Sequence, residues 1–424
     1  MVSKKRNSFD AVLDIVLFIG CLGMVLPFFT TLFPTSYVRI GSSLFFVVYY
    51  LLTHFANGKP IKTWIWITFV LMIICCFMPY LVGYPVIANR YLGMSFVFIA
   101  PIIYDFYRER NRIKELKRLL VILSVIGLFT LFTTYYNLLM SPYISRKAKG
   151  SGEVSVELAR KNIGGYGFIY AVSSVSVLFL FCSIRMKKPI MKLVFFTAWV
   201  LSFLLTIKSN FFTAMFILII GSLIVFIFAH KSRLKIVCLI LITMSLFVLL
   251  LSSQTIVDYL YSVLPTRVTS FLSLDANIFT SIFEEFTSDR LPTLNASIDA
   301  FIDYPLLGLC FSGNISYSGK FLAGFGQHSF ILDSFAIFGL IPGLLIIYVT
   351  LRPLLCGCKK SMTITFAIFV CMFILYVFDN ITDSITLVFG LVFPLIRDSI
   401  EEMEMSESEK SVRYIVNIRN TIHV

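Results

Sequence analysis

Charged residues are scarce in this sequence. Of its 424 residues, only 14% are Asp, Glu, Lys or Arg, whereas 58% are hydrophobic. A soluble domain needs a more charged surface, so this composition excludes one and indicates a polytopic membrane protein. The net charge of +13 does not indicate a nucleic-acid partner, because most Lys and Arg lie in short segments that flank apolar runs.

Patterns that bind metals or form disulfides are also lacking. The chain has nine cysteines, and no pair of them suggests a disulfide. The Cys356–Gly357–Cys358 sequence has no second pair of ligands that would complete a zinc site. No Asp-x-Asp motif occurs in the segments expected outside the membrane. We therefore expect no metal and no cofactor.

Long apolar runs are abundant. At roughly 20 residues per span, they predict an all-α bundle of about 12 transmembrane helices. The predicted spans are 10–33, 37–56, 63–82, 91–107, 118–139, 166–184, 193–208, 211–229, 236–253, 327–350, 361–378 and 382–397.

The basic segments between these spans predict the orientation. Every second connection is short and basic, including residues 108–118, 185–192 and 352–360. The positive-inside rule places these segments and both termini in the cytoplasm. The first apolar run is too long for a cleaved signal peptide, so we expect a retained anchor. Residues 1–397 then form the bundle, and residues 398–424 form a cytoplasmic tail.

Two long segments, 140–165 and 254–326, fall on the extracytoplasmic side, and long loops of this kind usually carry function. The first segment is net positive, and Arg160 and Lys161 lie just before Gly164–Gly165 at the start of a span. Glycine lets backbone N–H groups approach a ligand, and a helix N-terminus favours phosphate, so this pattern indicates an anion site. The alternative is a solvated loop that is basic by chance.

The second long segment is net negative and contains a predicted helix in "SDRLPTLNASIDAFIDYP". Ser288 suits an N-cap, and Pro305 follows the expected end. The apolar positions that share one face are Leu291, Leu294, Ile298, Phe301 and Ile302. We expect this face to pack against the bundle; the alternative is a helix that lies on the bilayer surface. Arg290 begins the helix, and Arg267 is a further cation in the same segment.

The next span opens with an ionisable residue. Of the four histidines, His328 alone falls at an outer helix end, where an imidazole can accept a proton from a hydroxyl. Asp333 lies on a different side of that helix, so we expect it to face another helix. Lys208, at the outer end of an earlier span, is either a further cation of the site or a snorkelling lysine. The other interpretation of His328 is a satisfied polar residue, and Pro342 is expected to kink the span.

Three stretches in this order resemble the bacterial O-antigen and capsular polysaccharide polymerase (Wzy-type) and ligase family. They are "ARKNIGGYGFIY", "SDRLPTLNASIDAFIDYPLLG" and "HSFILDSFAIFGLIPG". Motif similarity covers roughly residues 155–350. The chain departs from the family at Ser329, where Asn is frequent, and near Lys208, where relatives often have Ser-Arg.

The resemblance implies a GT-C-like lipid-carrier glycosyltransferase in the bacterial inner membrane. Its substrates would be oligosaccharides linked to undecaprenyl pyrophosphate, and a chain-length regulator and a flippase would be its partners. Arg160 and Arg290 would bind the pyrophosphate, and His328 would assist the acceptor hydroxyl. Arg267, Lys208, Lys161 and Asp333 are candidate substrate-binding residues. We expect an inverting, metal-independent polysaccharide polymerase.

Two alternatives stay open at this point. One is a ligase of the same family, and the other is a lipid-linked oligosaccharide flippase or other transporter. A transporter typically shows related halves or charges along its mid-span positions. Here the charges of interest fall at the outer face, and the sequence has no evident internal repeat, which favours an enzyme.

Overall fold

Helices make up all the regular structure that is described. The structure is a computed structural model, and it describes residues 8–141, 143–148, 153–209, 211–229, 291–312, 329–356, 362–379 and 383–400. Within these ranges there is no β-strand. The predicted span 236–253 lies outside the described residues.

The helices of the first half are α1 (Ser8–Val25), α2 (Phe29–Leu32), α3 (Thr35–Ala56), α4 (Thr63–Leu81), α5 (Pro85–Gly93), α6 (Phe96–Glu109), α7 (Ile113–Met140), α8 (Ile144–Lys147), α9 (Glu153–Arg160) and α10 (Tyr166–Arg185). The remaining helices are α11 (Pro189–Lys208), α12 (Phe212–Ala229), α17 (Leu291–Asp303), α18 (Leu309–Ser312), α20 (Phe330–Phe338), α21 (Leu340–Leu355), α22 (Met362–Phe378), α23 (Asp383–Leu387) and the π-helix η2 (Val388–Val392). Helix continues from η2 through residues 393–400.

Seven helical stretches among the described residues are long and apolar enough to cross a membrane, and one of them, Ile87–Glu109, takes in most of α5 and all of α6. Three shorter apolar helices lie within α12, α21 and α22. This confirms the membrane protein and its all-helical class, whereas the total of about 12 spans stays a prediction.

Two predicted spans in the first half of the chain differ in detail from the helices. The span expected over 10–33 ends at Val25, because Pro27 lacks the N–H group that would continue the helix. A separate short helix, α2, follows. The span expected over 91–107 is divided into α5 and α6 near Gly93, a residue of low helix propensity.

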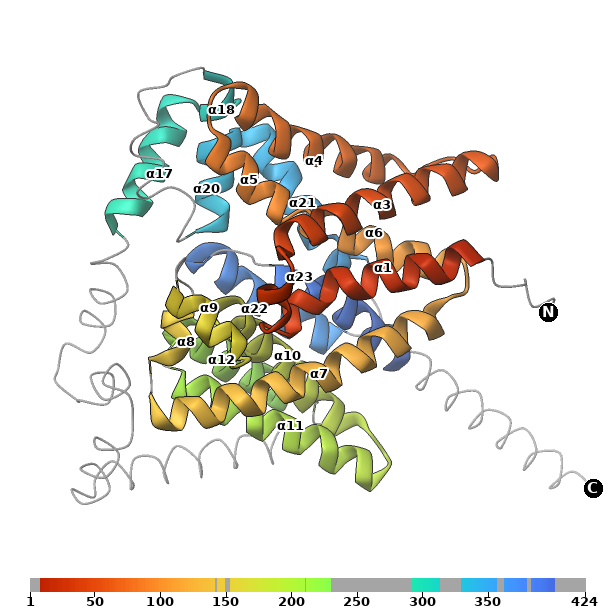
Figure 1. Cartoon of the computed structure of the whole chain (residues 1–424), viewed down its shortest axis with the longest axis vertical. Helices are drawn as coiled ribbons and strands as arrows, with labels where there is room; N and C mark the ends of the chain where they lie inside the picture. The colour runs from red at the N-terminus through yellow and green to blue at the C-terminus, as the bar shows by residue number, and fades with distance from the viewer. Residues whose placement is uncertain are drawn as a thin grey trace, which may run out of the picture.

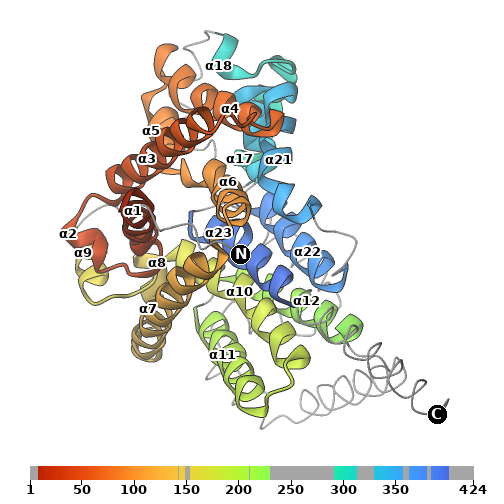
Figure 2. The same ribbon diagram turned by 90° about the vertical axis from the view of Figure 1, so that its right-hand side faces the viewer.

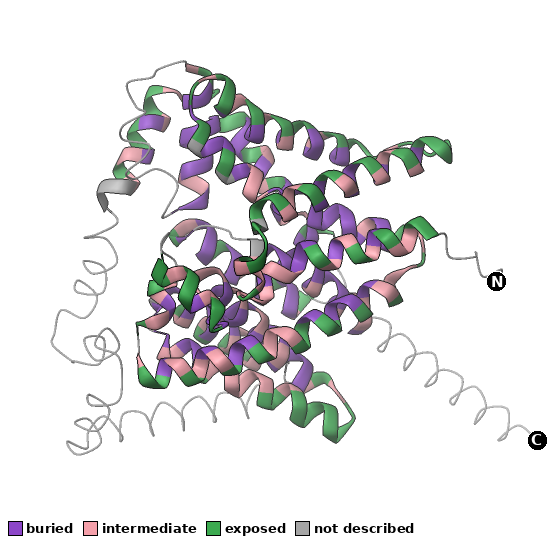
Figure 3. Cartoon of the chain, in the orientation of Figure 1, coloured by how far each residue is buried: buried purple, intermediate pink, exposed green. Residues whose placement is uncertain are grey.

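The bundle has buried central helices and exposed outer ones. The central helices α6 and α10 are buried over most of their surface, whereas α7 and α11 have long rows of exposed apolar side chains (Figures 1 and 3). Figure 2 shows α6, α10 and α23 enclosed by the other helices. Exposed apolar rows are what lipid-facing helices require, because hydrocarbon solvates them.

Ion pairs join several helix ends at one end of the bundle, which we call the charged end. Arg112, between α6 and α7, donates to Asp10 at 2.9 Å and to Asp14 at 2.7 Å, both on α1. Lys62, at the start of α4, lies 2.6 Å from Glu109 at the end of α6. These pairs bring together the starts of α1, α4 and α7 and the end of α6.

The last helical residues also reach the charged end. Arg397 donates to the carbonyl of Pro353 at 2.8 Å and pairs with Asp398, which accepts from the Tyr104 hydroxyl. Ile400 is buried as well. The segments α8, α9, α17 and α18 lie at the opposite end of the bundle (Figure 1).

The Arg112 pairs make a testable contribution to stability. Its side chain is only 11% exposed, so Arg112→Met removes a cation that pairs with two largely buried carboxylates, of which Asp10 keeps Arg110 at 3.2 Å. We expect the free energy of unfolding to fall by about 3 kcal/mol. Thermal unfolding in detergent measures the effect, and Lys114→Met at an exposed neighbouring position is the control. Equal melting temperatures for the two variants would contradict this role.

Candidate functional site at the opposite end

The structure describes four of the seven predicted site residues. Arg160, Lys161, Lys208 and Asp333 are described, and each is located below. The predicted residues Arg267, Arg290 and His328 lie outside the described residues.

A buried hydrogen bond joins two of the motifs. Ser297 of α17 donates its hydroxyl to Asp333 Oδ1 of α20 at 2.9 Å, and both side chains are buried. The rings of Phe301 and Phe335 pack beside this pair, with centroids 5.6 Å apart. The expectation that Asp333 faces another helix is therefore confirmed, and its partner is α17. A carboxylate is costly in an apolar bundle, so this bond favours one position of α17.

Two glycines bring the same motifs into backbone contact. Gly308 and Gly339 both have positive φ, +69° and +79°. A Cβ atom on Gly308 would lie 2.2 Å from the backbone nitrogen of Gly339, so neither position has room for a side chain. Leu340 N donates to the Pro305 carbonyl at 2.8 Å. The turn Pro305–Gly308, which follows α17, is thus fixed against the junction of α20 and α21.

Gly339, and not Pro342, divides the predicted span 327–350. Gly339 is at once the C-cap of α20 and the N-cap of α21, with a φ that favours glycine. Pro342 lies in the first turn of α21, where a helix needs no N–H donor, so it causes no kink there. The expected kink at Pro342 is therefore wrong.

The apolar stripe predicted for α17 is only partly buried. Ser297 and Ala300 make the buried face, whereas Ile298 is 38% and Ile302 is 67% exposed. Small side chains allow α17 to approach α20 closely, and the larger side chains turn away. The helix itself ends at Asp303, before Pro305, as predicted.

The N-terminus of α20 lies against the end of α22. The Ser329 hydroxyl caps α20 by accepting from Leu332 N, and it donates to the Tyr376 carbonyl at 3.3 Å. Phe330 N donates to the carbonyl of Asp379 at 3.0 Å, and the Asp379 side chain is only 2% exposed.

The sequence analysis missed Asp379. It falls between two predicted spans, and its neighbour in space, the start of α20, is distant in sequence. The only signal was an acidic residue at an outer helix end, next to an apolar run.

The first outer segment is pinned to the bundle by Asn162. This residue has a positive φ of 54°, donates to Thr130 Oγ1 at 2.9 Å, and accepts from Thr133 Oγ1 through its carbonyl at 2.7 Å. Gly164 N donates to Thr134 Oγ1 at 2.8 Å. The Gly164 N–H is therefore used inside the bundle, and the expectation that it faces a ligand is wrong.

Arg160 and Lys161 sit at the exposed end of α9. Lys161 donates to Glu157 at 2.6 Å, and this hydrogen bond, together with the charge of Lys161, lowers the pKa of the Glu157 carboxyl. Arg160 is exposed, and within the described ranges it has no hydrogen bond or ion pair to α17 or α20. Among the described residues, α17 and the turn after it, from the second stretch, thus lie against α20, from the third stretch. Arg160, from the first stretch, makes no such contact with them.

Arg146 is a further cation of the segment 140–165. Its guanidinium lies over the Phe211 ring, 5.4 Å from the centroid, and Phe211 also packs against Tyr166 at the start of α10. Lys208, half-buried at the end of α11, precedes Phe211 closely in the chain. The aromatic contact favours one orientation of the Arg146 guanidinium plane.

The chemistry this end offers is that of anion binding and proton transfer. Its described ionisable groups include the cations Arg146, Arg160 and Lys208 and the buried carboxylates Asp333 and Asp379. In the described part of the chain, no three His, Cys, Asp or Glu side chains form a group that could hold a metal ion.

The glycine contact gives a second prediction. Gly339→Ala adds a Cβ that would lie 2.4 Å from the Leu306 backbone, at a φ that alanine rarely adopts. We expect α17 and α18 to lose their position, with at least tenfold faster hydrogen exchange over residues 291–312. Gly41→Ala is the matched control, because a Cβ there meets nothing within 4 Å. Unchanged exchange in Gly339→Ala would contradict the proposed role of this contact.

Comparison with known proteins adds no family. No family model matches the chain, and no curated protein matches it. The resemblance to the polymerase and ligase family therefore rests on the three sequence motifs.

Proposed function

We propose that the protein is a Wzy-type polysaccharide polymerase of the bacterial inner membrane. It joins oligosaccharide repeat units carried on undecaprenyl pyrophosphate, and it acts at the opposite end of the bundle, which faces the periplasm or cell exterior. The charged end then faces the cytoplasm, in agreement with the basic connections predicted to lie there. The proposed architecture is a GT-C-like bundle of about 12 spans.

One observation carries the proposal. The second and third stretches that carry the family resemblance, "SDRLPTLNASIDAFIDYPLLG" and "HSFILDSFAIFGLIPG", are joined in one packed unit by the Ser297–Asp333 hydrogen bond and the Gly308–Gly339 contact. Leu291, which follows Arg290, begins the helix of this unit, and Ser329, which follows His328, caps the other helix. This packing supports a common role for Arg290 and His328.

The proposed reaction needs groups of the kinds found at this end. Arg160 and Arg290 bind the pyrophosphate of the donor and stabilise the charge that develops as the glycosidic bond breaks. His328 accepts the proton of the attacking sugar hydroxyl, a contribution of typically 10²–10⁴-fold. The hydroxyl oxygen attacks the anomeric carbon, and the lipid pyrophosphate leaves with the bonding electrons. A single displacement of this kind inverts the configuration.

Asp379 is proposed as a positioning residue. Its buried side chain lies on the segment that accepts a hydrogen bond from Phe330 N, beside the capped start of α20. A carboxylate in this place can orient an imidazole at the helix mouth.

Alanine substitution tests the assigned cations and the histidine. We expect Arg160→Ala, Arg290→Ala and His328→Ala each to lower polymer formation by at least 100-fold, because each removes a group that acts in the transition state. The measurement is the ladder of products that the purified variants form from lipid-linked repeat units. Asp379→Asn is expected to lower the rate by about tenfold and to alter its pH profile.

Lys192→Ala serves as the control, since it removes an exposed cation on the first turn of α11. Each variant must also be inserted and as abundant as wild type. Full-length polymer from all three alanine variants would show that the site assignment is wrong.

Reconstitution in the presence of a chelator tests the mechanism and the class of protein together. Because the proposed chemistry uses protein cations, we expect the same product ladder with and without EDTA. A ladder that forms only after Mg²⁺ or Mn²⁺ is restored would contradict metal independence. Transfer of oligosaccharide to a different acceptor would indicate the ligase, and movement of the lipid-linked unit across the bilayer without bond formation would indicate the flippase.

A further inference from the structure

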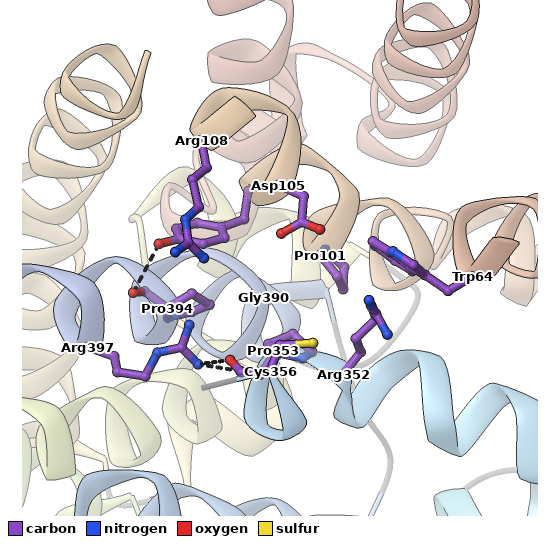
Figure 4. Close-up of a pocket in the computed structure, with 11 residues that line it drawn as sticks. Trp64, Pro101, Asp105, Arg108, Arg352, Pro353, Cys356, Gly390, Pro394 and Arg397 are labelled. Carbon is purple, nitrogen blue, oxygen red and sulfur yellow. Dashed lines mark hydrogen bonds between the residues drawn. The ribbon is translucent and has the colours of Figure 1, made fainter. Parts of the chain in front are cut away.

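A recess at the charged end has no role in the proposed reaction. It lies between α4, α6, α21 and the helical residues 393–400, and the residues that matter here are Trp64, Asp105, Arg108, Arg352 and Arg397 (Figure 4). We call it the arginine recess. Pro101, Pro353 and Pro394 also line it, and they limit conformational change in its wall.

The three arginines differ in how fully the protein uses them. Arg397 is buried and donates to the carbonyls of Pro353 and Cys356 and to Asp398. It therefore caps the end of α21, and few of its N–H donors remain for a ligand. Arg108 is 62% exposed and lies 3.8 Å from Asp398, which is a loose pair. Asp105 is already paired with Lys62 at 3.4 Å.

Arg352 is the cation best placed to bind an anion. Its guanidinium stacks 4.1 Å from the centroid of the Trp64 ring, and one nitrogen donates to the Tyr348 hydroxyl at 2.9 Å. In the part of the chain that the structure describes, no carboxylate lies within 4.0 Å of this guanidinium. Stacking on Trp64 fixes the plane of the Arg352 guanidinium, and the N–H groups that do not bond to Tyr348 can donate to a ligand.

Trp64 provides an independent observation that points to a ligand. Its side chain is buried, with 7% exposed, and its Nε1–H has no acceptor among the described residues. A buried N–H donor without an acceptor is rare and destabilising, so an acceptor oxygen supplied by a ligand would explain it. Trp64 and Arg352 lie side by side at the edge of the recess (Figure 4).

Exposed apolar side chains lead away from the recess. They follow α21, the helix that carries Arg352, on the same side as that residue, and comprise Ile341, Leu344 and Tyr348. Trp64 is in the first turn of α4 and Arg352 in the last turn of α21, which are the depths at which membrane helices meet lipid headgroups. A ligand with an anionic head and apolar chains fits this arrangement.

We propose that the arginine recess binds the phosphodiester headgroup of an anionic membrane lipid, whose acyl chains lie along α21. Arg352 and Arg108 bind the phosphate oxygens, and the Trp64 Nε1–H donates to one of them. Basic recesses between membrane helices are suited to this class of lipid. The site is independent of the proposed polymerase reaction.

Native mass spectrometry of the full chain in detergent tests the site. Dioleoyl phosphatidylglycerol is compared with dioleoyl phosphatidylcholine, which has the same acyl chains and no net charge. We expect the wild type to bind phosphatidylglycerol more tightly. Arg352→Gln should weaken that binding by about tenfold and Trp64→Phe by about threefold, the factors expected for a charged and a neutral hydrogen bond.

Two controls make the test specific. Trp64→Phe keeps an aromatic face under Arg352 and removes the N–H donor together with the pyrrole part of the indole, so a folded variant is expected even if Arg352→Gln is unstable. Lys192→Gln, at an exposed position of α11, should leave phosphatidylglycerol binding unchanged.

Three results would overturn the proposal. The first is wild-type binding of phosphatidylglycerol by both Arg352→Gln and Trp64→Phe. The second is displacement of the lipid by millimolar inorganic phosphate, which would make the recess a site for a soluble anion. The third is binding that occurs only after Glu401, Glu402 and Glu404 are replaced by Gln, which would make the chain's own acidic segment the occupant.

Discussion

The contact between Gly308 and Gly339 is the constraint on which the opposite end of the bundle depends. The backbones at Gly308 and Gly339 touch at a point where neither has room for a Cβ atom. This contact fixes the position of the turn after α17 relative to the junction of α20 and α21. The Ser297–Asp333 hydrogen bond then sets the rotation of α17 on α20. In a lipid environment, where apolar contact alone drives association weakly, close backbone approach and a buried polar pair are effective ways to fix helices.

The two ends of the bundle use charge in different ways. At the charged end, Arg112 and Lys62 are neutralised by carboxylates on other helices, whereas Arg352 stacks on Trp64. At the opposite end, Arg160 is exposed, and Asp333 accepts a hydrogen bond from the Ser297 hydroxyl. A site that must bind and release a polyanionic lipid carrier needs cations that are not already paired within the protein. The exposed Arg160 meets this requirement at the opposite end.

The sequence predicted the membrane class, the helix α17 and its end before Pro305, because these depend on hydropathy and local capping. It could not predict which residues of α17 are buried, since a stripe of Ile298 and Ile302 looks like a packing face until the smaller Ser297 and Ala300 are seen against α20. The division of the span at Gly339 was assigned to Pro342, because the turn that crowds Gly339 lies far away in sequence. Asp379 and the partner of Asp333 were beyond prediction for the same reason.

The central claim is that cations from separate outer segments meet at one diphosphate beside His328. The most direct measurement is a cryo-EM structure of the full chain in a lipid nanodisc with undecaprenyl pyrophosphate bound. The account predicts phosphate oxygens at about 3 Å from the guanidinium groups of Arg160 and Arg290, with His328 beside the terminal phosphate. A diphosphate bound at the charged end, or one that contacts neither arginine, would contradict it.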